Sequence, residues 1–512
     1  MRNLKPWVKI ALIVIVIAGL AFGIKMVTGN KTDGVKSNKS GFLSDLIGGD
    51  NDVINVGVNT YVGFLQLVWL NNGLEPNEDS PIYKDYGLKL NITINDDFDA
   101  GRAAFKNGDI DLIYCTTDVL CTEMGSGSDM LDAREFMILD KSRGADVIVV
   151  NKNINTVADL KGKTIAFAES TVSQSLLLNV LETNGVNPSD IKYVKVGDGI
   201  QAAEYFKAGK VDACVTWSPI DADCVKAISG SKTLISTKQA SELSSDGLLA
   251  KSEYIEKNKD KLVKLASAVL YANSLMTNDE KTLKQAAEIF SKCFEGFKPQ
   301  DCIDGSKNVR YVTLGDQINY FGLNSSFTGV TAEQIYSKMA RTYESIGLTN
   351  NPAPWRKVSD SSIIEELANN QGQVKGEQSA ESVKTFTAPT KEHETKAEIS
   401  DKKLAVQFQT NSSVLDNDAR ALIDREFVSI AKQFRDIRIR VEGNTDNVGN
   451  PEYNKELSYK RAQSVVNYLV NDYGFDKNRF IIVGNGSKHA IENGSNGSDA
   501  SYRVTDFQLI NE

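Results

Sequence analysis

Short β-branched runs alternate with helical runs through the middle of this 512-residue chain. VINVGV at 53–58 and DIDLIYCT at 109–116 have the composition of buried strands, and AGRAAFKNG at 100–108 has a helical pattern. The same alternation continues as far as VDACVTW at 211–217. It predicts an α/β architecture in which helices cover both faces of parallel or mixed sheets. Ligands of such folds bind beyond the carboxyl ends of the strands, near the starts of helices.

Two polar segments divide the chain. Residues 31–52 are polar and contain glycine, and residues 369–400 lack a periodic apolar pattern, so both are predicted linkers, the second a flexible one. Residues 53–368 then form one large region, and residues 401–512 form a small domain. A chain of this length is too long for a single core, which agrees with several domains.

Residues 1–30 have the pattern of a targeting signal. An uncharged run at 10–24 lies between Lys9 and Lys25, and further basic residues precede it. This run is short for a membrane span, which needs about 17–25 residues, unless the two lysines extend toward the membrane surfaces. A cleaved signal peptide is the alternative, but we expect a transmembrane helix that anchors the protein in the inner membrane. Either one places the remainder in the periplasm.

Composition excludes several classes of function. The net charge is −9 at pH 7 and there is no dense run of Lys and Arg, so we expect no nucleic-acid partner. Both histidines, His393 and His489, lie outside residues 50–360, which therefore have no histidine to act as a general base or metal ligand. We accordingly expect no enzyme activity, no cofactor and no metal site.

The six cysteines form three local pairs along the large region. An even number of cysteines is typical of an oxidising compartment. Pairing of neighbours is the simplest of the connectivities that six cysteines allow, and the lack of a CxxC motif argues against zinc. The candidate disulfide residues are Cys115, Cys121, Cys214, Cys224, Cys293 and Cys302.

Four stretches of the large region carry a resemblance to a known family. DKSRGADVIVV begins at 140, TVADLKGKTIAFAESTVSQSLLLNVLE at 156, AAEYFKAGKVDACVTWSPI at 202 and YIEKNKDKLVKLASAVLYAN at 254. In content, order and spacing they are similar to type 2 periplasmic solute-binding proteins of ABC transporters, particularly the nitrate-, taurine- and sulfonate-binding group. The resemblance implies two lobes that close on a ligand. Lobe one comprises 53–140 and 230–360, and lobe two 145–228.

The resemblance places the ligand against the strand-to-helix turns of both lobes. Hydroxyl and N–H groups at the helix start after Glu169 would suit an anion, and Tyr61 and Trp217 would form rigid walls. Each could instead be only a helix cap or a core residue. Ser218, where the family usually has an acid, and Cys115 at a strand end leave the ligand open between a small anion and an organic solute. The predicted solute-binding residues are Asn59, Thr60, Tyr61, Thr116, Thr117, Ser170, Thr171, Ser173, Trp217 and Ser218.

Residues 401–512 have the order strand, helix, strand, helix, strand, strand, and the first predicted strand is LAVQFQ at 404–409. A polar loop, GNTD, ends in Asp446, and an amphipathic helix carries Arg461 fifteen positions later. This run is similar to the OmpA-like peptidoglycan-binding domain, an α+β fold of βαβαββ order.

By this resemblance, the acid and the base hold the diaminopimelate of a peptidoglycan stem peptide. The free end of diaminopimelate is a zwitterion, which needs a carboxylate for its ammonium and a guanidinium for its carboxylate. Each such hydrogen bond would contribute about 1.5–3 kcal/mol, whereas a salt bridge that only pins Asp446 to Arg461 would contribute about 0–1 kcal/mol. The predicted peptidoglycan-binding residues are Asp446, Arg461, Thr445, Asn454, Leu457 and Arg503.

Together these features predict a membrane-anchored, wall-tethered periplasmic receptor. Its expected partners are peptidoglycan, a small-molecule ligand, the inner membrane through the N-terminal helix, and an ABC transporter permease or a sensor. The alternative is a structural envelope protein that links membrane and wall and whose middle module binds a protein.

Overall fold

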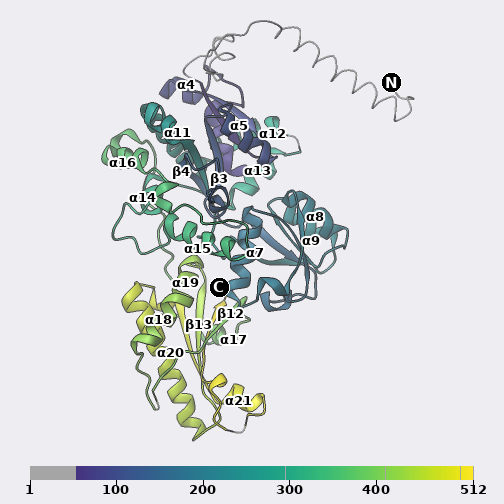
Figure 1. The fold of residues 1–512 in the computed structure, drawn as a ribbon, viewed down its shortest axis with the longest axis vertical. Helices are drawn as coiled ribbons and strands as arrows, with labels where there is room; N and C mark the ends of the chain where they lie inside the picture. Colours follow the sequence, from purple (N-terminus) through teal and green to yellow (C-terminus); the bar gives the residue numbers. More distant parts are fainter. Residues whose placement is uncertain (1–52, 295, 410, 496, 511–512) are drawn as a thin grey trace, which may run out of the picture. The chain divides into compact units, whose positions relative to one another are not determined.

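The computed structural model describes residues 53–510, apart from 295, 410 and 496. The predicted membrane anchor and first linker, residues 1–52, lie outside this range. Within the described residues, no helix is long and apolar enough to cross a membrane. Three sheets organise these residues (Figure 1).

The first sheet has six strands and mixes parallel with antiparallel pairing. In sheet order its strands are β11 (Val309–Tyr311), β4 (Ala133–Ser142), β10 (Ser245–Lys251), β3 (Leu112–Thr116), β1 (Val53–Val58) and β2 (Lys89–Ile94). The helices that precede or follow them are η1 (Val62–Phe64), α3 (Leu65–Asn71), α4 (Pro81–Tyr86), α5 (Phe98–Asn107), α6 (Leu120–Glu123), α10 (Ser252–Lys257), α11 (Lys259–Asn278), α12 (Glu280–Cys293), α13 (Pro299–Ser306), α14 (Leu314–Tyr320), α15 (Ala332–Ser345), η4 (Trp355–Lys357) and α16 (Ser362–Asn369). β1 is parallel to β2 and β3, and β10 enters antiparallel between β3 and β4.

The second sheet has five strands with helices on both faces. In sheet order they are β7 (Lys192–Val196), β6 (Thr164–Ala168), β8 (Ala213–Trp217), β5 (Asp146–Val150) and β9 (Lys232–Ser236), and the helices are η2 (Val157–Leu160), α7 (Val172–Thr183), η3 (Pro188–Asp190), α8 (Gly199–Lys207) and α9 (Ile220–Ala227). Ile148 of β5 belongs to the core cluster that includes α7, whereas Val147 and Val149 pack with α8 and α9. Because both faces are covered, β5 is a continuous apolar run.

Two short crossings connect the first two sheets. The chain passes from β4 to β5 through 143–145 and returns from β9 to β10 through 237–244. The hydroxyl oxygens of Ser142 and Thr237 are 2.8 Å apart, which ties the two crossings together. β9 lies in the second sheet although the predicted lobe two ended at 228. The β9 sequence KTLIS is only partly buried, so its apolar pattern was too weak to assign this strand to lobe two from the sequence.

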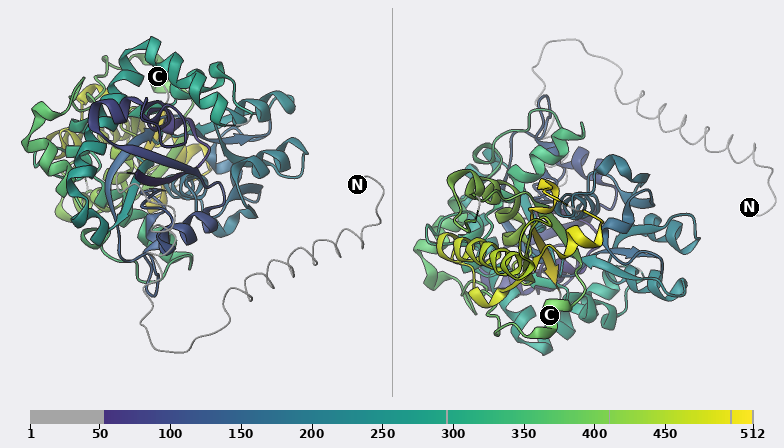
Figure 2. Two further views of the ribbon diagram at one scale, coloured as in Figure 1. Left: turned by 90° about the horizontal axis from the view of Figure 1, so that it is seen from above. Right: turned by 90° about the horizontal axis from the view of Figure 1, so that it is seen from below.

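The third sheet has four strands and lies near the end of the chain. Its strands are β12 (Ser400–Leu404), β15 (Thr505–Ile510), β13 (Arg438–Asn444) and β14 (Phe480–Gly486), and its helices are α18 (Asn417–Ile423), η6 (Asp424–Val428), α19 (Ser429–Gln433), α20 (Pro451–Tyr473), η7 (Lys477–Arg479), α21 (Lys488–Glu492) and η8 (Ala500–Tyr502). The long helix α20, yellow-green in the right-hand view of Figure 2, packs along β13 and β14. The predicted strand at 404–409 was wrong for most of its length, because pairing with β15 ends at Leu404.

The segment 369–400, predicted to be a flexible linker, is held by hydrogen bonds. The Thr313 hydroxyl donates to the Ser379 carbonyl at 2.8 Å, and the Phe386 N–H donates to the Asp476 carboxylate at 3.0 Å. Two short helices, η5 (Gln371–Gln373) and α17 (Lys391–Thr395), form within it. Neighbouring residues thus satisfy polar groups that the sequence pattern assigned to solvent, and the segment is not a free tether here.

Candidate ligand-binding sites

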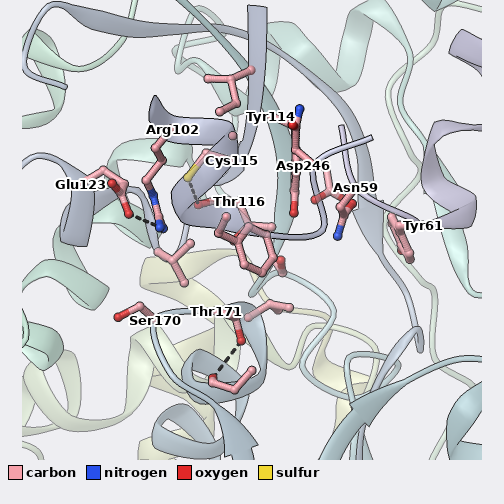
Figure 3. Close-up of a pocket in the computed structure, with 18 of the residues that line it drawn as sticks. Asn59, Tyr61, Arg102, Tyr114, Cys115, Thr116, Glu123, Ser170, Thr171 and Asp246 are labelled. Carbon is pink, nitrogen blue, oxygen red and sulfur yellow. Dashed lines mark hydrogen bonds and ion pairs between the residues drawn. The ribbon is translucent and has the colours of Figure 1, made fainter. Parts of the chain in front are cut away.

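A cavity of about 100 Å³ lies among the turns at the strand ends of the first two sheets. Asn59, Tyr61 and Asp246 approach it from one side, and Ser170 and Thr171 approach it from the other (Figure 3). The first three belong to the turn after β1 and to β10, and the last two precede α7. Side chains from both predicted lobes therefore converge on one space.

Six predicted solute-binding residues line this cavity, namely Asn59, Tyr61, Thr116, Ser170, Thr171 and Trp217. The other four lie outside its lining. Thr60 is bound to the Asp96 carboxylate, Thr117 is buried and donates to Glu135 at 3.1 Å, and Ser218 donates to Asp221 at 3.2 Å. Ser173 is buried in the first turn of α7. A turn brings only some of its residues to a ligand, and the sequence did not show which ones.

The start of α7 is already occupied by the chain's own hydrogen bonds. Ser170 has a left-handed φ of 54°, which bends the chain into the helix. Its N–H donates to the Gln174 side chain at 2.7 Å, and the Ser173 N–H donates to the Thr171 hydroxyl at 3.2 Å. These two N–H groups are therefore not available to an anion.

Trp217 forms one wall of the cavity, at the end of β8. A Cβ atom at Gly199 would lie only 2.4 Å from its indole ring. The backbone at the start of α8 thus packs directly against the indole, which holds the ring in place. Only glycine allows this approach.

Carboxylates also line the cavity, and none of them was among the predicted solute-binding residues. Asp146 begins β5 and Asp246 lies on β10, and both are buried in the lining. Asp246 pairs in register with Asp140 of β4, so the two carboxyl groups lie on the same face of the sheet and each affects the pKa of the other. Burial, more than any neighbouring charge, raises the pKa of Asp146 and that of Asp246 to about 7 and raises that of Asp140 well above its ordinary value. Asp146 stands inside the quoted GADVIVV run, but Asp246 had no motif to mark it.

Arg102 is the single basic side chain in the lining. Its guanidinium lies 2.5 Å from the Glu123 carboxylate (Figure 3). It also lies 3.1 Å from the Asp99 carboxylate. Its charge is therefore matched within the protein before any ligand binds.

All six cysteines are free thiols in this structure. Cys214 and Cys224 lie close enough to hydrogen-bond with each other. Oxidation of this pair stays a prediction, as does pairing of the other four cysteines.

The second candidate site lies where β13 meets the loop before α20. Asp446 accepts a hydrogen bond at 2.8 Å from Arg503, which the sequence also placed in this site. Arg461 of α20 donates from Nε to the Ser412 carbonyl at 3.1 Å and lies over the Phe408 ring. Its pKa is lowered by burial and raised by Asp446, so the two charges influence each other. Among the described residues, however, no direct ion pair joins them, so the salt bridge considered as an alternative does not form.

Other residues of this second site hold the loop in shape. The Asn454 side chain donates to the Val448 carbonyl at 2.9 Å, and Asn444 donates to Asp506 at 3.2 Å. The Thr445 hydroxyl is buried and makes no hydrogen bond among the described residues. Leu457 is half-buried on α20. A Cβ at Gly443 would lie 2.1 Å from the Ser458 carbonyl, so glycine lets the helix approach the strand.

Two family models match separate parts of the chain. The model described as NMT1/THI5 like matches residues 82–282, and the OmpA family model matches residues 407–503. The chain therefore combines an NMT1/THI5-like domain with a C-terminal OmpA family domain. The fold agrees with that of a solved structure, the periplasmic nitrate-binding protein NrtA from Synechocystis PCC 6803 (TM-score 0.50, 14% identity, 64% of this chain and 92% of that one).

Curated relatives are similar to parts of the chain. The Escherichia coli (strain K12) protein named "Putative aliphatic sulfonates-binding protein" is 36% identical over 120 residues, which cover 22% of this chain and 35% of that protein. Outer membrane porin F of Pseudomonas aeruginosa is 35% identical over 95 residues, which cover 19% of this chain and 27% of the porin. The chain thus spans about a third or less of the length of each of these relatives.

Proposed function

We propose that this protein is a non-enzymatic solute receptor of the cell envelope that also binds peptidoglycan. In this proposal residues 53–368 form the receptor module, residues 369–400 connect it, and residues 401–512 bind the wall. The N-terminal segment anchors the protein in the inner membrane, and an ABC transporter permease or a sensor receives the solute.

One observation carries the receptor proposal: polar side chains from two sheets meet at a cavity between their strand ends. Two lobes joined by short crossings can open and close around such a space, and closure makes the ligand contact both at once. A tightly bound solute should survive purification of the full chain from its host. Native mass spectrometry should then show an adduct that is released on denaturation, and a spectrum of bare protein in every preparation would count against a receptor.

The wall-binding proposal rests on the separated charges of Asp446 and Arg461. Asp446 is held by one arginine, and Arg461 makes no ion pair among the described residues, so its terminal nitrogens can take a ligand carboxylate. Asp446→Ala and Arg461→Ala should each lower cosedimentation of the full chain with purified sacculi at least tenfold, since each removes a charge-assisted hydrogen bond. Lys460→Ala is the matched control, because Lys460 is an exposed neighbour on α20 paired with Glu456. Wild-type binding by both site variants would disprove the assignment.

A further inference from the structure

The charge of the cavity has the wrong sign for an anion. Four carboxylates line it, and the single guanidinium among the lining residues, that of Arg102, is already paired with two acids. The carboxylates are those of Glu123, Asp146, Asp198 and Asp246. Glu123 pairs with Arg102, and Asp198 caps α8 by accepting the Gln201 N–H at 2.8 Å. Asp146 and Asp246 are left over.

Neither of these two acids has a cationic partner. Asp246 is 7% exposed and Asp146 is 6% exposed, and among the described residues no lysine or arginine forms an ion pair with either one. Asp146 accepts one hydrogen bond, from the Ser142 hydroxyl at 2.7 Å. Asp246 lies opposite a third acid, Asp140, which is 0% exposed. Burying several carboxylates without a counter-charge is costly, so a cation from outside would relieve the arrangement.

Independent of the acids, the wall around them offers unused polar atoms. The side-chain oxygens of Asn59, Tyr61 and Thr116 are buried and make no hydrogen bond among the described residues. All three residues line the cavity, and Asn59 and Tyr61 lie on the same side as Asp246 (Figure 3). Each of these oxygens can accept a hydrogen bond, and an ammonium group has three donors and no acceptor. Tyr61 and Trp217 add aromatic rings to the lining, and the faces of such rings attract cations.

We propose that the solute carries a protonated amine, which enters between Asp146 and Asp246 and donates to the acceptor oxygens beside them. This rests on the proposed receptor function and narrows it to a class of ligand opposite in charge to nitrate or a simple sulfonate. The hydroxyls and N–H groups before α7 do not oppose it, because Ser170 and Ser173 use their N–H groups within the chain.

Thermal shift and calorimetry on the full chain at pH 8 and constant ionic strength test the proposal. The amine probes are putrescine, agmatine, spermidine and choline, and the anion probes are nitrate, methanesulfonate and phosphate. At least one amine should raise the midpoint of unfolding in a saturable way, and no anion should. Binding of an anion alone would overturn the amine proposal but leave a receptor in place. If neither the amines nor the anions shift the unfolding midpoint, the amine proposal is also overturned. If native mass spectra in addition show only bare protein, the receptor proposal is rejected as well.

Asp246→Asn removes the charge and keeps the shape. We expect it to weaken the amine at least tenfold. We also expect it to raise the unfolding midpoint of the empty protein at pH 8, because one buried charge is gone. A merely structural aspartate would behave in the opposite way, with a lower midpoint in the variant. Asp109→Asn, at an exposed position outside the cavity, is the matched control. Unchanged amine affinity in Asp246→Asn would overturn the proposal even if both proteins fold equally well.

Discussion

At the scale of single residues, the cavity acids set a pH dependence that runs against the usual one. Asp246 has a folded-state pKa of about 7, against 3.8 for an ordinary aspartate. It faces Asp140 on β4, Asp146 on β5 and Asp118, and Tyr61 and Tyr114 lie beside it, so no cation offsets the burial. The folded protein therefore holds a proton that the unfolded chain has released between about pH 4 and pH 7.

Stability of the empty protein should consequently fall as the pH rises through that window. Below about pH 4, Asp246 is protonated in both the folded and the unfolded state. Above about pH 7 it is ionised in both states, and the full free-energy cost of burying its charge is present. Chemical unfolding at pH 5 and pH 7.5 should show the loss, and Asp246→Asn should reduce it. A variant with the same difference between the two pH values as the wild type would mean that Asp246 is not responsible.

At the scale of elements, α20 shows how local sequence places a functional side chain. Asn450 accepts the Tyr453 N–H at 2.9 Å, Pro451 opens the helix, and Gly474 ends it with a φ of 69°. These signals fix the start of the helix and thus the position of Arg461, three turns in. They are readable in the sequence, as was the start of α7 at Thr171.

Asn450→Ala should therefore lower the free energy of unfolding by about 1 kcal/mol, because it removes the cap. Asn450→Asp keeps a capping oxygen and should restore most of the loss. Urea unfolding of both variants measures the difference. Equal losses in the two would show that the cap contributes nothing.

Other elements could not be predicted because pairing is not local. The alternation of Leu404, Val406 and Phe408 is a good strand pattern, yet β12 ends at Leu404, opposite Thr505, where its antiparallel partner β15 begins. The residues of the cavity could be predicted only in part for the same reason. The strand-to-helix turns were predictable from the alternation, whereas Asp246 reaches the site because β10 inserts between β3 and β4 more than 100 residues further along the chain. A sequence pattern shows which residues favour a strand, but not which strand lies beside it.

At the scale of the whole molecule, a buried ionic cluster joins distant parts of the sequence. Glu242 is 3% exposed and contacts Lys141 at 2.7 Å, Arg143 at 3.0 Å and Arg435 at 3.2 Å. These cations outweigh burial and hold its pKa at about 2, below the usual 4.5. Its contribution to stability is thus present above about pH 4.5 and is lost as the pH falls toward 2.

Glu242→Gln leaves the buried Lys141 and the half-buried Arg143 and Arg435 with less counter-charge, and it should lower the free energy of unfolding at pH 7 by about 3 kcal/mol. Near pH 3 the gap between variant and wild type should shrink. Glu256→Gln, at an exposed position, serves as the control. If Glu242→Gln lowers the free energy of unfolding by less than about 0.5 kcal/mol at pH 7, the ionic cluster does not stabilise the fold.

The facing carboxyl groups of Asp140 and Asp246 have a consequence for how a loaded receptor is recognised. Their raised pKa values mean that the empty cavity keeps a proton that ordinary aspartates would have released, and in the proposed binding mode an arriving ammonium would displace it. Cargo and proton would then exchange one for one, and the total charge of the protein would hardly change when the ligand binds. A membrane partner would then have to sense the filled state through the altered spacing of the lobes, because the electrostatic surface that it meets is nearly the same with and without cargo.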